Sequence, residues 1–79
     1  MKTNPETVEY IRRFGTRVRL LRQERGLSQE ELAERVDVHR TFIGMIERGE
    51  KNATLVTIVK ISGGLEVSVA ELLRGLENA

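Results

Sequence analysis

Apolar residues recur at helical spacing in the first third of the chain. Between residues 5 and 25 they fall three or four positions apart, and the stripe consists of Val8, Ile11, Phe14, Val18 and Leu21. Residues at i, i+3 and i+4 share one face of a helix, so this spacing predicts a single long amphipathic helix. Asn4 can cap this helix, Pro5 suits its first turn, and Gly26 can end it in the left-handed conformation.

A short second helix is predicted after this glycine. Ser28 and Glu31 have the spacing of a capping box, in which each side chain binds the backbone N–H of the other residue. The helix should end near Asp37, because aspartate tolerates a positive φ better than most residues. Ala33 lies where a following helix would approach most closely, since a bulky side chain there would push the two helices apart.

A third helix is predicted over residues 40–47, after a turn of about three residues. Ile43 and Ile46 face inward in this helix, and Gly49 can end it. The two short helices together predict a helix-turn-helix over about residues 28–48. The outer face of its second helix, which a DNA-binding protein turns toward the major groove, carries Arg40, Thr41, Gly44 and Met45.

Two further helices complete an all-α fold of five helices. Thr54 can cap the fourth, whose predicted apolar face consists of Leu55, Ile58, Ile61 and Leu65. Gly63 and Gly64 are poor helix formers, so the last turn is expected to fray or kink. Ser68 and Glu71 form a second predicted capping box, which begins a final helix with Leu72, Leu73 and Leu76.

Composition favours one small globular domain over residues 1–79. The 79 residues are 39% hydrophobic and 32% charged, which is typical of a soluble protein that folds. The sequence has no cysteine, so disulfides and thiol catalysis are excluded, and no apolar run is long enough to span a bilayer. We therefore expect a cytoplasmic protein without a leader or a membrane partner.

The sequence contains no candidate catalytic site. There is one histidine, His39, and neither a phosphate-binding glycine loop nor a pair of metal-spaced ligands is present. We therefore expect no enzyme activity, no metal, no cofactor and no small-molecule ligand.

Charge is distributed unevenly, although the net charge is only +1. Residues 1–25 contain seven Lys and Arg against three acidic residues, whereas residues 26–50 contain three against six. The basic first helix is compatible with a nucleic-acid partner and equally with a solvated helix face.

Two segments carry a resemblance to a known family. The sequence GLSQEELA at residues 26–33, followed by IGMIERGE at 43–50, resembles the Cro/lambda-repressor-like helix-turn-helix family, also called Xre. More narrowly, HRTFIG at 39–44 and ERGEKN at 47–52 are similar to the controller proteins of restriction-modification systems. The chain departs from the family pattern at three positions, where Asp37, Ala53 and Glu66 replace a glycine, a proline and a glycine.

The resemblance implies a set of base-reading residues at the start of the third helix. Arg40 and Thr41 match positions that read base edges, and an arginine can bind guanine O6 and N7 with two hydrogen bonds. Phe42 can contact a thymine methyl group or pack on the domain. Met45 can contact a thymine methyl group or fill space between helices.

The resemblance also implies contacts to the DNA backbone. Gln29 matches a phosphate-binding position at the start of the second helix, and Arg48, Lys51 and Asn52 match positions in the loop after the third helix. The alternative for Arg48 and Lys51 is an ordinary solvated charge. His39 is expected to cap the third helix or to contact a phosphate.

The resemblance also implies an ion pair that positions the third helix, and the small size of the domain favours a dimer. Arg22 and Glu47 match an ion pair between the first helix and the third, the alternative being two separate surface charges. A single short recognition helix binds a half-site poorly, so a homodimer is expected. The candidate interface lies on the fourth and fifth helices and consists of Val59, Val69, Leu73 and Leu76.

The expected function is that of a transcriptional regulator that binds a palindromic operator in double-stranded DNA as a homodimer, and RNA polymerase is a further candidate partner. A restriction-modification controller fits the narrower resemblance. The alternatives are a phage-type or other Xre repressor, and an antitoxin-like module that binds another protein.

Overall fold

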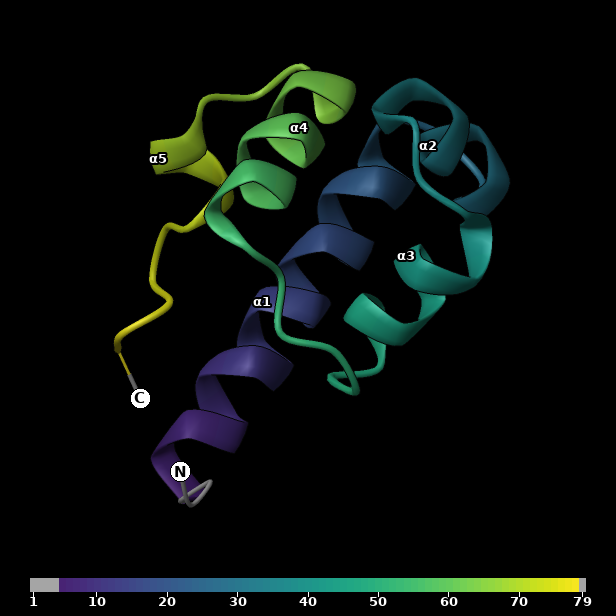
Figure 1. Cartoon of the computed structure of the whole chain (residues 1–79). Coiled ribbons are helices and arrows are strands. Elements are labelled where there is room, and N and C mark those ends of the chain that lie inside the picture. Colours follow the sequence, from purple (N-terminus) through teal and green to yellow (C-terminus); the bar gives the residue numbers. More distant parts are fainter. Residues whose placement is uncertain (1–4, 79) are drawn as a thin grey trace.

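The computed structural model describes residues 5–78, which form five helices and, among these residues, no strand. They are α1 (Pro5–Glu24), α2 (Gln29–Val36), α3 (Arg40–Glu47), α4 (Leu55–Leu65) and α5 (Val69–Leu72). The predicted all-α fold is confirmed. α1 crosses the molecule diagonally, with α2 and α3 on one side and α4 and α5 on the other (Figure 1). Asn4, the predicted cap of α1, lies outside the described residues.

The core lies where α1, α2, α3 and α4 meet. Its buried apolar residues are Phe14, Val18, Leu21, Leu27, Leu32, Ala33, Val36, Ile43, Ile46, Ile61, Leu65 and Leu72. The predicted stripe of α1 is confirmed at Phe14, Val18 and Leu21, but Val8 is exposed and Ile11 is only half-buried. The stripe is shorter than predicted because the first turns of α1 extend past the other helices (Figure 1).

The ends of α2 and α4 follow the predicted local chemistry. The Glu31 N–H donates to Ser28 Oγ at 3.0 Å and the Ser28 N–H donates to the Glu31 carboxylate at 2.8 Å, which confirms the first capping box. The hydrogen bond from the Ser28 backbone lowers the pKa of the Glu31 carboxyl below its ordinary value. Asp37 and Glu66, which replace family glycines, adopt φ of 58° and 59°, a left-handed conformation that costs about 1 kcal/mol relative to glycine.

α4 differs from its predicted form at both ends. Leu55 was expected on the buried face, but its first-turn position lies outside the core and leaves it 73% exposed. The last turn was expected to fray or kink at the paired glycines, yet the helix continues to Leu65. Gly64 packs directly on α2, because a Cβ there would lie 2.5 Å from Val36 Cγ1. Arg25 also donates to the carbonyl of Leu65 at 2.8 Å, so tertiary contacts hold this turn in place.

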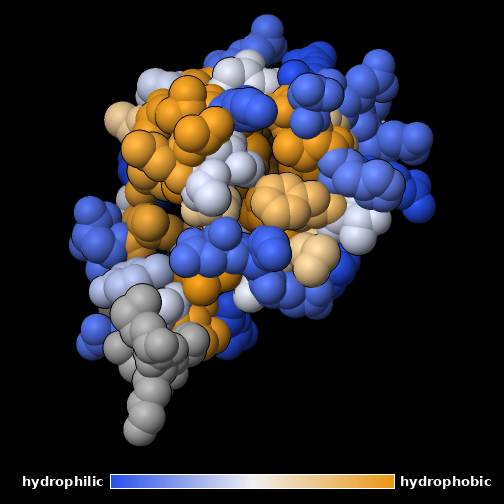
Figure 2. Space-filling view, in the orientation of Figure 1, coloured by the Kyte–Doolittle hydropathy of each residue, from blue (hydrophilic) through white to orange (hydrophobic). Residues whose placement is uncertain are grey.

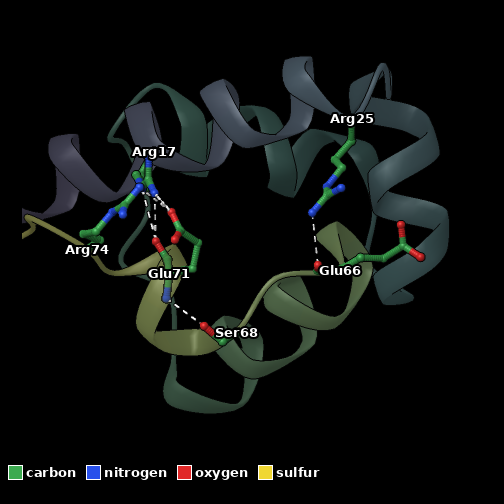
Figure 3. A network of polar contacts seen from close by, with 6 residues as sticks. All are labelled: Arg17, Arg25, Glu66, Ser68, Glu71 and Arg74. Atoms are coloured by element: carbon green, nitrogen blue, oxygen red, sulfur yellow. Dashed lines mark hydrogen bonds and ion pairs between the residues drawn. The ribbon is translucent and has the colours of Figure 1, made fainter.

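α5 is shorter than predicted and is attached to α1 by charged side chains. Ser68 Oγ accepts a hydrogen bond from the Glu71 N–H, as predicted. Among the described residues the reciprocal bond from the Ser68 N–H to the Glu71 carboxylate does not form, so the second capping box is only half made. The Glu71 carboxylate instead pairs with Arg17 of α1 and with Arg74 (Figure 3). Arg17 also donates to the Glu71 carbonyl at 2.9 Å. The final helix ends at Leu72, and the chain continues in turns.

Gly15 allows α1 and α3 to touch. A Cβ at this position would overlap the carbonyl oxygen of Ile46 and would lie 2.9 Å from the carbonyl oxygen of Glu47. The backbone of α1 therefore rests directly on the last turn of α3. No local pattern distinguished this glycine, since the periodicity of α1 runs past it without interruption.

Candidate nucleic-acid interface

α2 and α3 form the predicted helix-turn-helix. The left-handed Asp37 ends α2, and His39 begins α3 two residues later. Ala33 and Val36 of α2 and Ile43 of α3 are all buried in the contact between these helices and the core. The small side chain of Ala33 lies inside this junction, as the close crossing of the two helices requires.

The start of α3 presents its polar side chains to solvent. Arg40 is 67% exposed and makes one weak contact, an ion pair of 3.7 Å with the exposed Glu30 carboxylate. Thr41 is also exposed. An exposed arginine with a loose partner can exchange that partner for a guanine edge.

Three other residues of α3 differ in their surroundings. Phe42 is half-buried and packs against the core, which supports the packing alternative for this ring. Met45 is half-buried but is not among the side chains that pack on the core. Gly44 was expected on the outer face and is buried, because the side chains of Arg48 and Gln29 lie over it.

His39 caps α3. Its Nδ1 accepts a hydrogen bond of 3.1 Å from the Thr41 backbone N–H, so the cap alternative is confirmed. An accepting Nδ1 carries no hydrogen, and the neutral ring then carries its hydrogen on Nε2. The exposed side chain can use this N–H as a donor without breaking the cap.

Arg22 and Glu47 form the ion pair that the resemblance implies. Arg22 Nε and Nη2 donate to the two Glu47 carboxylate oxygens at 2.7 and 3.0 Å. The side chains are 11% and 3% exposed, so this is a buried bidentate pair and not two separate surface charges. Arg22 Nη1 donates to the Leu27 carbonyl at 2.7 Å, and the Gln29 side-chain amide donates to Glu47 at 3.1 Å. One carboxylate thus holds α1, α2 and α3 together.

The loop after α3 carries the remaining predicted backbone contacts. Arg48 Nε donates to the Glu50 carboxylate at 2.9 Å, and this hydrogen bond lowers the pKa of Glu50 and raises the pKa of Arg48. Both side chains remain more than half exposed. Lys51 and Asn52 are exposed as well, so all three predicted loop contacts lie at the surface.

The predicted dimer residues do not form one exposed surface. Val59 is 51% exposed, but Val69 is half-buried, and Leu73 and Leu76 are half-buried and pack against the core. After Leu72 the chain continues in turns, and these two leucines pack against the core. Their part in an interface stays a prediction.

The predicted interface residue Val59 belongs to a larger apolar surface on α4, of which two residues were missed. Leu55 and Val56 are 73% and 63% exposed and lie beside Val59 on α4, and orange side chains gather over α4 in Figure 2. Leu55, Val56 and Val59 are called the α4 apolar face below. The signal in the sequence was that α4 has more apolar positions than one buried face needs.

Within residues 5–78 no helix combines the length and the apolar character that a membrane-spanning segment requires. The same residues contain no cluster of three or more His, Cys, Asp or Glu side chains suited to a metal ion.

Comparison with known proteins identifies the class to which this fold belongs. The helix-turn-helix family model HTH_3 matches residues 18–72, a span that begins in α1 and ends at the last residue of α5. The chain therefore belongs to the helix-turn-helix family, a class of DNA-binding transcriptional regulators.

Several similar proteins are control proteins, and one similar solved structure is that of a restriction-modification controller protein. The control protein C.MunI of Mycoplasma sp is 42% identical over 66 residues, which cover 82% of this chain and 89% of the relative. The control protein C.SmaI of Serratia marcescens is 48% identical over 63 residues, 77% of this chain and 75% of the relative. The crystal structure of the controller protein C.AhdI from Aeromonas hydrophila superimposes with a TM-score of 0.77 at 42% identity, covering 78% and 94% of the two chains. None of these relatives is named as an enzyme.

Proposed function

We propose that this protein is a restriction-modification controller that binds a palindromic DNA operator as a homodimer and does not act as an enzyme. In this proposal α3 enters the major groove, and Arg40 and Thr41 read base edges. The observation that carries the proposal is the exposed start of α3, which the buried Arg22–Glu47 pair holds at a fixed angle to α1. The similarity to control proteins supports the choice of regulator.

The backbone contacts are assigned to residues around α3. Gln29 and His39 lie at the starts of α2 and α3, where helix dipoles favour anions. Arg48, Lys51 and Asn52 lie in the exposed loop after α3. Contacts of this kind set the register of a protein on the duplex and leave sequence choice to the base-reading residues.

Replacing Arg40 tests the base-reading role. We expect Arg40→Ala to reduce the preference for the operator by about 1–3 kcal/mol at each half-site, roughly fivefold to 150-fold, while affinity for random DNA stays nearly unchanged. Lys51→Ala should weaken binding to every duplex similarly and reduce the salt slope by about one per protomer. The measurement is fluorescence anisotropy on an operator selected from random duplexes. Equal losses of Arg40→Ala on operator and random DNA would contradict the assignment.

The homodimer is proposed to form through the α4 apolar face. Three exposed apolar side chains on one short helix are unfavourable in water, and a second copy can bury them. Two α3 helices would then lie about 34–36 Å apart, one turn of B-DNA, which matches a palindromic operator.

A charge in this face should separate the two copies. We expect Val59→Glu to sediment as a monomer at micromolar concentration and to lose operator affinity, because dimer formation would bury the new carboxylate. Val8→Glu, at an exposed apolar position of α1, is the matched control and should remain dimeric. A wild-type protein that is a monomer both at this concentration and on the operator would refute the model.

The rival functions make different predictions. A phage-type repressor would lack a neighbouring endonuclease or methyltransferase gene. A protein-binding module would capture one partner stably through its apolar face and would not shift DNA.

A further inference from the structure

Most arginine side chains in the described part of the chain have an acidic or carbonyl partner. Arg13, Arg17, Arg22, Arg25, Arg35, Arg40, Arg48 and Arg74 all donate to, or pair with, a carboxylate or a backbone oxygen. Within residues 5–78, Arg12, Arg19, Lys51 and Lys60 are exposed and have no such partner. Two of these four cations, Arg12 and Lys51, belong to segments that meet at the turn after α3.

The Cα and the first side-chain carbons of Arg12 lie against the turn after α3. Gly49 has a φ of 73°, and a Cβ there would lie 3.2 Å from Arg12 Cα and 2.8 Å from Arg12 Cγ. The turn and α1 are thus in direct contact. Lys51 and Asn52 line a small apolar cavity together with Tyr10 and Ile11, which immediately precede Arg12. The start of α1 and the loop proposed to touch DNA therefore form one surface.

The nearby carboxylates leave the charge of Arg12 uncompensated. Glu9 lies three residues earlier on α1, where it could pair with Arg12, but it instead pairs with Arg13 at 3.3 Å. Glu50, beside the turn, accepts two hydrogen bonds from Arg48 at 2.9 and 3.3 Å. The Cα and Cγ of Arg12 lie against the turn that precedes Lys51 and Asn52, and a guanidinium without a protein partner is suited to a phosphate group.

We propose that Arg12 binds a DNA phosphate and extends the backbone contacts of the α3 loop onto the first turns of α1. Arg12 lies outside residues 18–72, which the family model matches, so this contact is an addition to the shared helix-turn-helix. The inference rests on the proposed DNA-binding function. The start of α1 would then contribute to the affinity for DNA and not to the recognition of the base sequence.

Removal of the guanidinium tests the contact. We expect Arg12→Ala to weaken binding to operator and random duplexes alike, by about three- to tenfold near 0.1 M salt, and to reduce the salt slope by about one per protomer. Arg12→Lys should retain most of the affinity and the salt slope, because the charge remains. Arg19→Ala is the matched control, since it removes an exposed, unpartnered arginine from the same helix about 10 Å further along the axis. It should change affinity by less than about twofold.

Several results would overturn the inference. If the wild type binds DNA and Arg12→Ala binds it equally well, the proposed contact of Arg12 with a phosphate is wrong, but the proposed DNA-binding function is unaffected. Equal losses of DNA affinity in Arg12→Ala and Arg19→Ala would show a general effect of the positive charge of α1 and not a specific contact of Arg12 with a phosphate. A loss confined to the operator would indicate base reading. Failure of the wild type to bind any duplex would instead reject the proposed function itself. Thermal unfolding by circular dichroism checks that each variant is folded.

Discussion

We expect Gly15→Ala to be the most destabilising conservative substitution in this protein. The added Cβ would overlap the Ile46 carbonyl, and both atoms belong to rigid helical backbone, so α1 and α3 must separate. The expected loss is about 3 kcal/mol or more in the free energy of unfolding. In a domain of this size that loss lowers the melting temperature by about 12–24 °C. Thermal and urea unfolding measure it.

Gly63→Ala is the matched control for this substitution. Gly63 is also a helical glycine, but a Cβ there would meet no atom within 4 Å. Alanine is the better helix former, so Gly63→Ala should stabilise the protein by about 0.5–1 kcal/mol. A Gly15→Ala protein as stable as wild type would show that α1 and α3 are further apart than the structure has them.

The second large effect is expected from loss of the buried carboxylate of Glu47. Glu47→Ala leaves the Arg22 guanidinium, which is 11% exposed, without its charged partner, and it removes an acceptor of Gln29. Breaking one side of a buried ion pair costs about 3–5 kcal/mol, because the remaining charge stays desolvated. The orientation of α3 on α1 is lost with it, so operator affinity should fall as well. Urea unfolding and anisotropy on the same samples measure the two effects.

Two variants separate the charge from the packing at this position. Glu50→Ala removes a carboxylate that also pairs with an arginine, but at an exposed site, and it should change stability little. The double variant Arg22→Met with Glu47→Leu removes both charges and should recover most of the stability, although DNA affinity should stay low. A Glu47→Ala protein with wild-type stability would show that the Arg22–Glu47 pair does not stabilise the fold.

Features that depend on neighbouring residues were predictable from the sequence. The capping box of Ser28 and Glu31 and the left-handed end at Asp37 depend on the preferences of a few adjacent residues. The helix-turn-helix followed from the same local signals and from the resemblance. The residues of the Arg22–Glu47 pair could be matched to the family, but their burial could not be judged before the helices were packed.

Features that depend on how far each helix extends from the core were predicted less well. Val8 and Leu55 continue the apolar spacing of their helices, but both lie in first turns that no other helix covers. Leu73 and Leu76, which were expected at a dimer interface, also pack on the core where the chain continues in turns after Leu72. Periodicity identifies the apolar face of a helix and does not say how many of its turns have a neighbour.

The amino-acid sequence alone determined where α2, α3 and α4 begin and which residues stand at the start of α3, since capping and helical periodicity act over a few residues. Only the tertiary structure decided that Gly15 is a point of helix contact, that Glu47 joins three helices, and that Arg12 lies beside the loop after α3. These relations join residues 18 to 37 positions apart in the chain, so no local pattern records them. They arise when the close packing of the core brings distant backbone segments into contact.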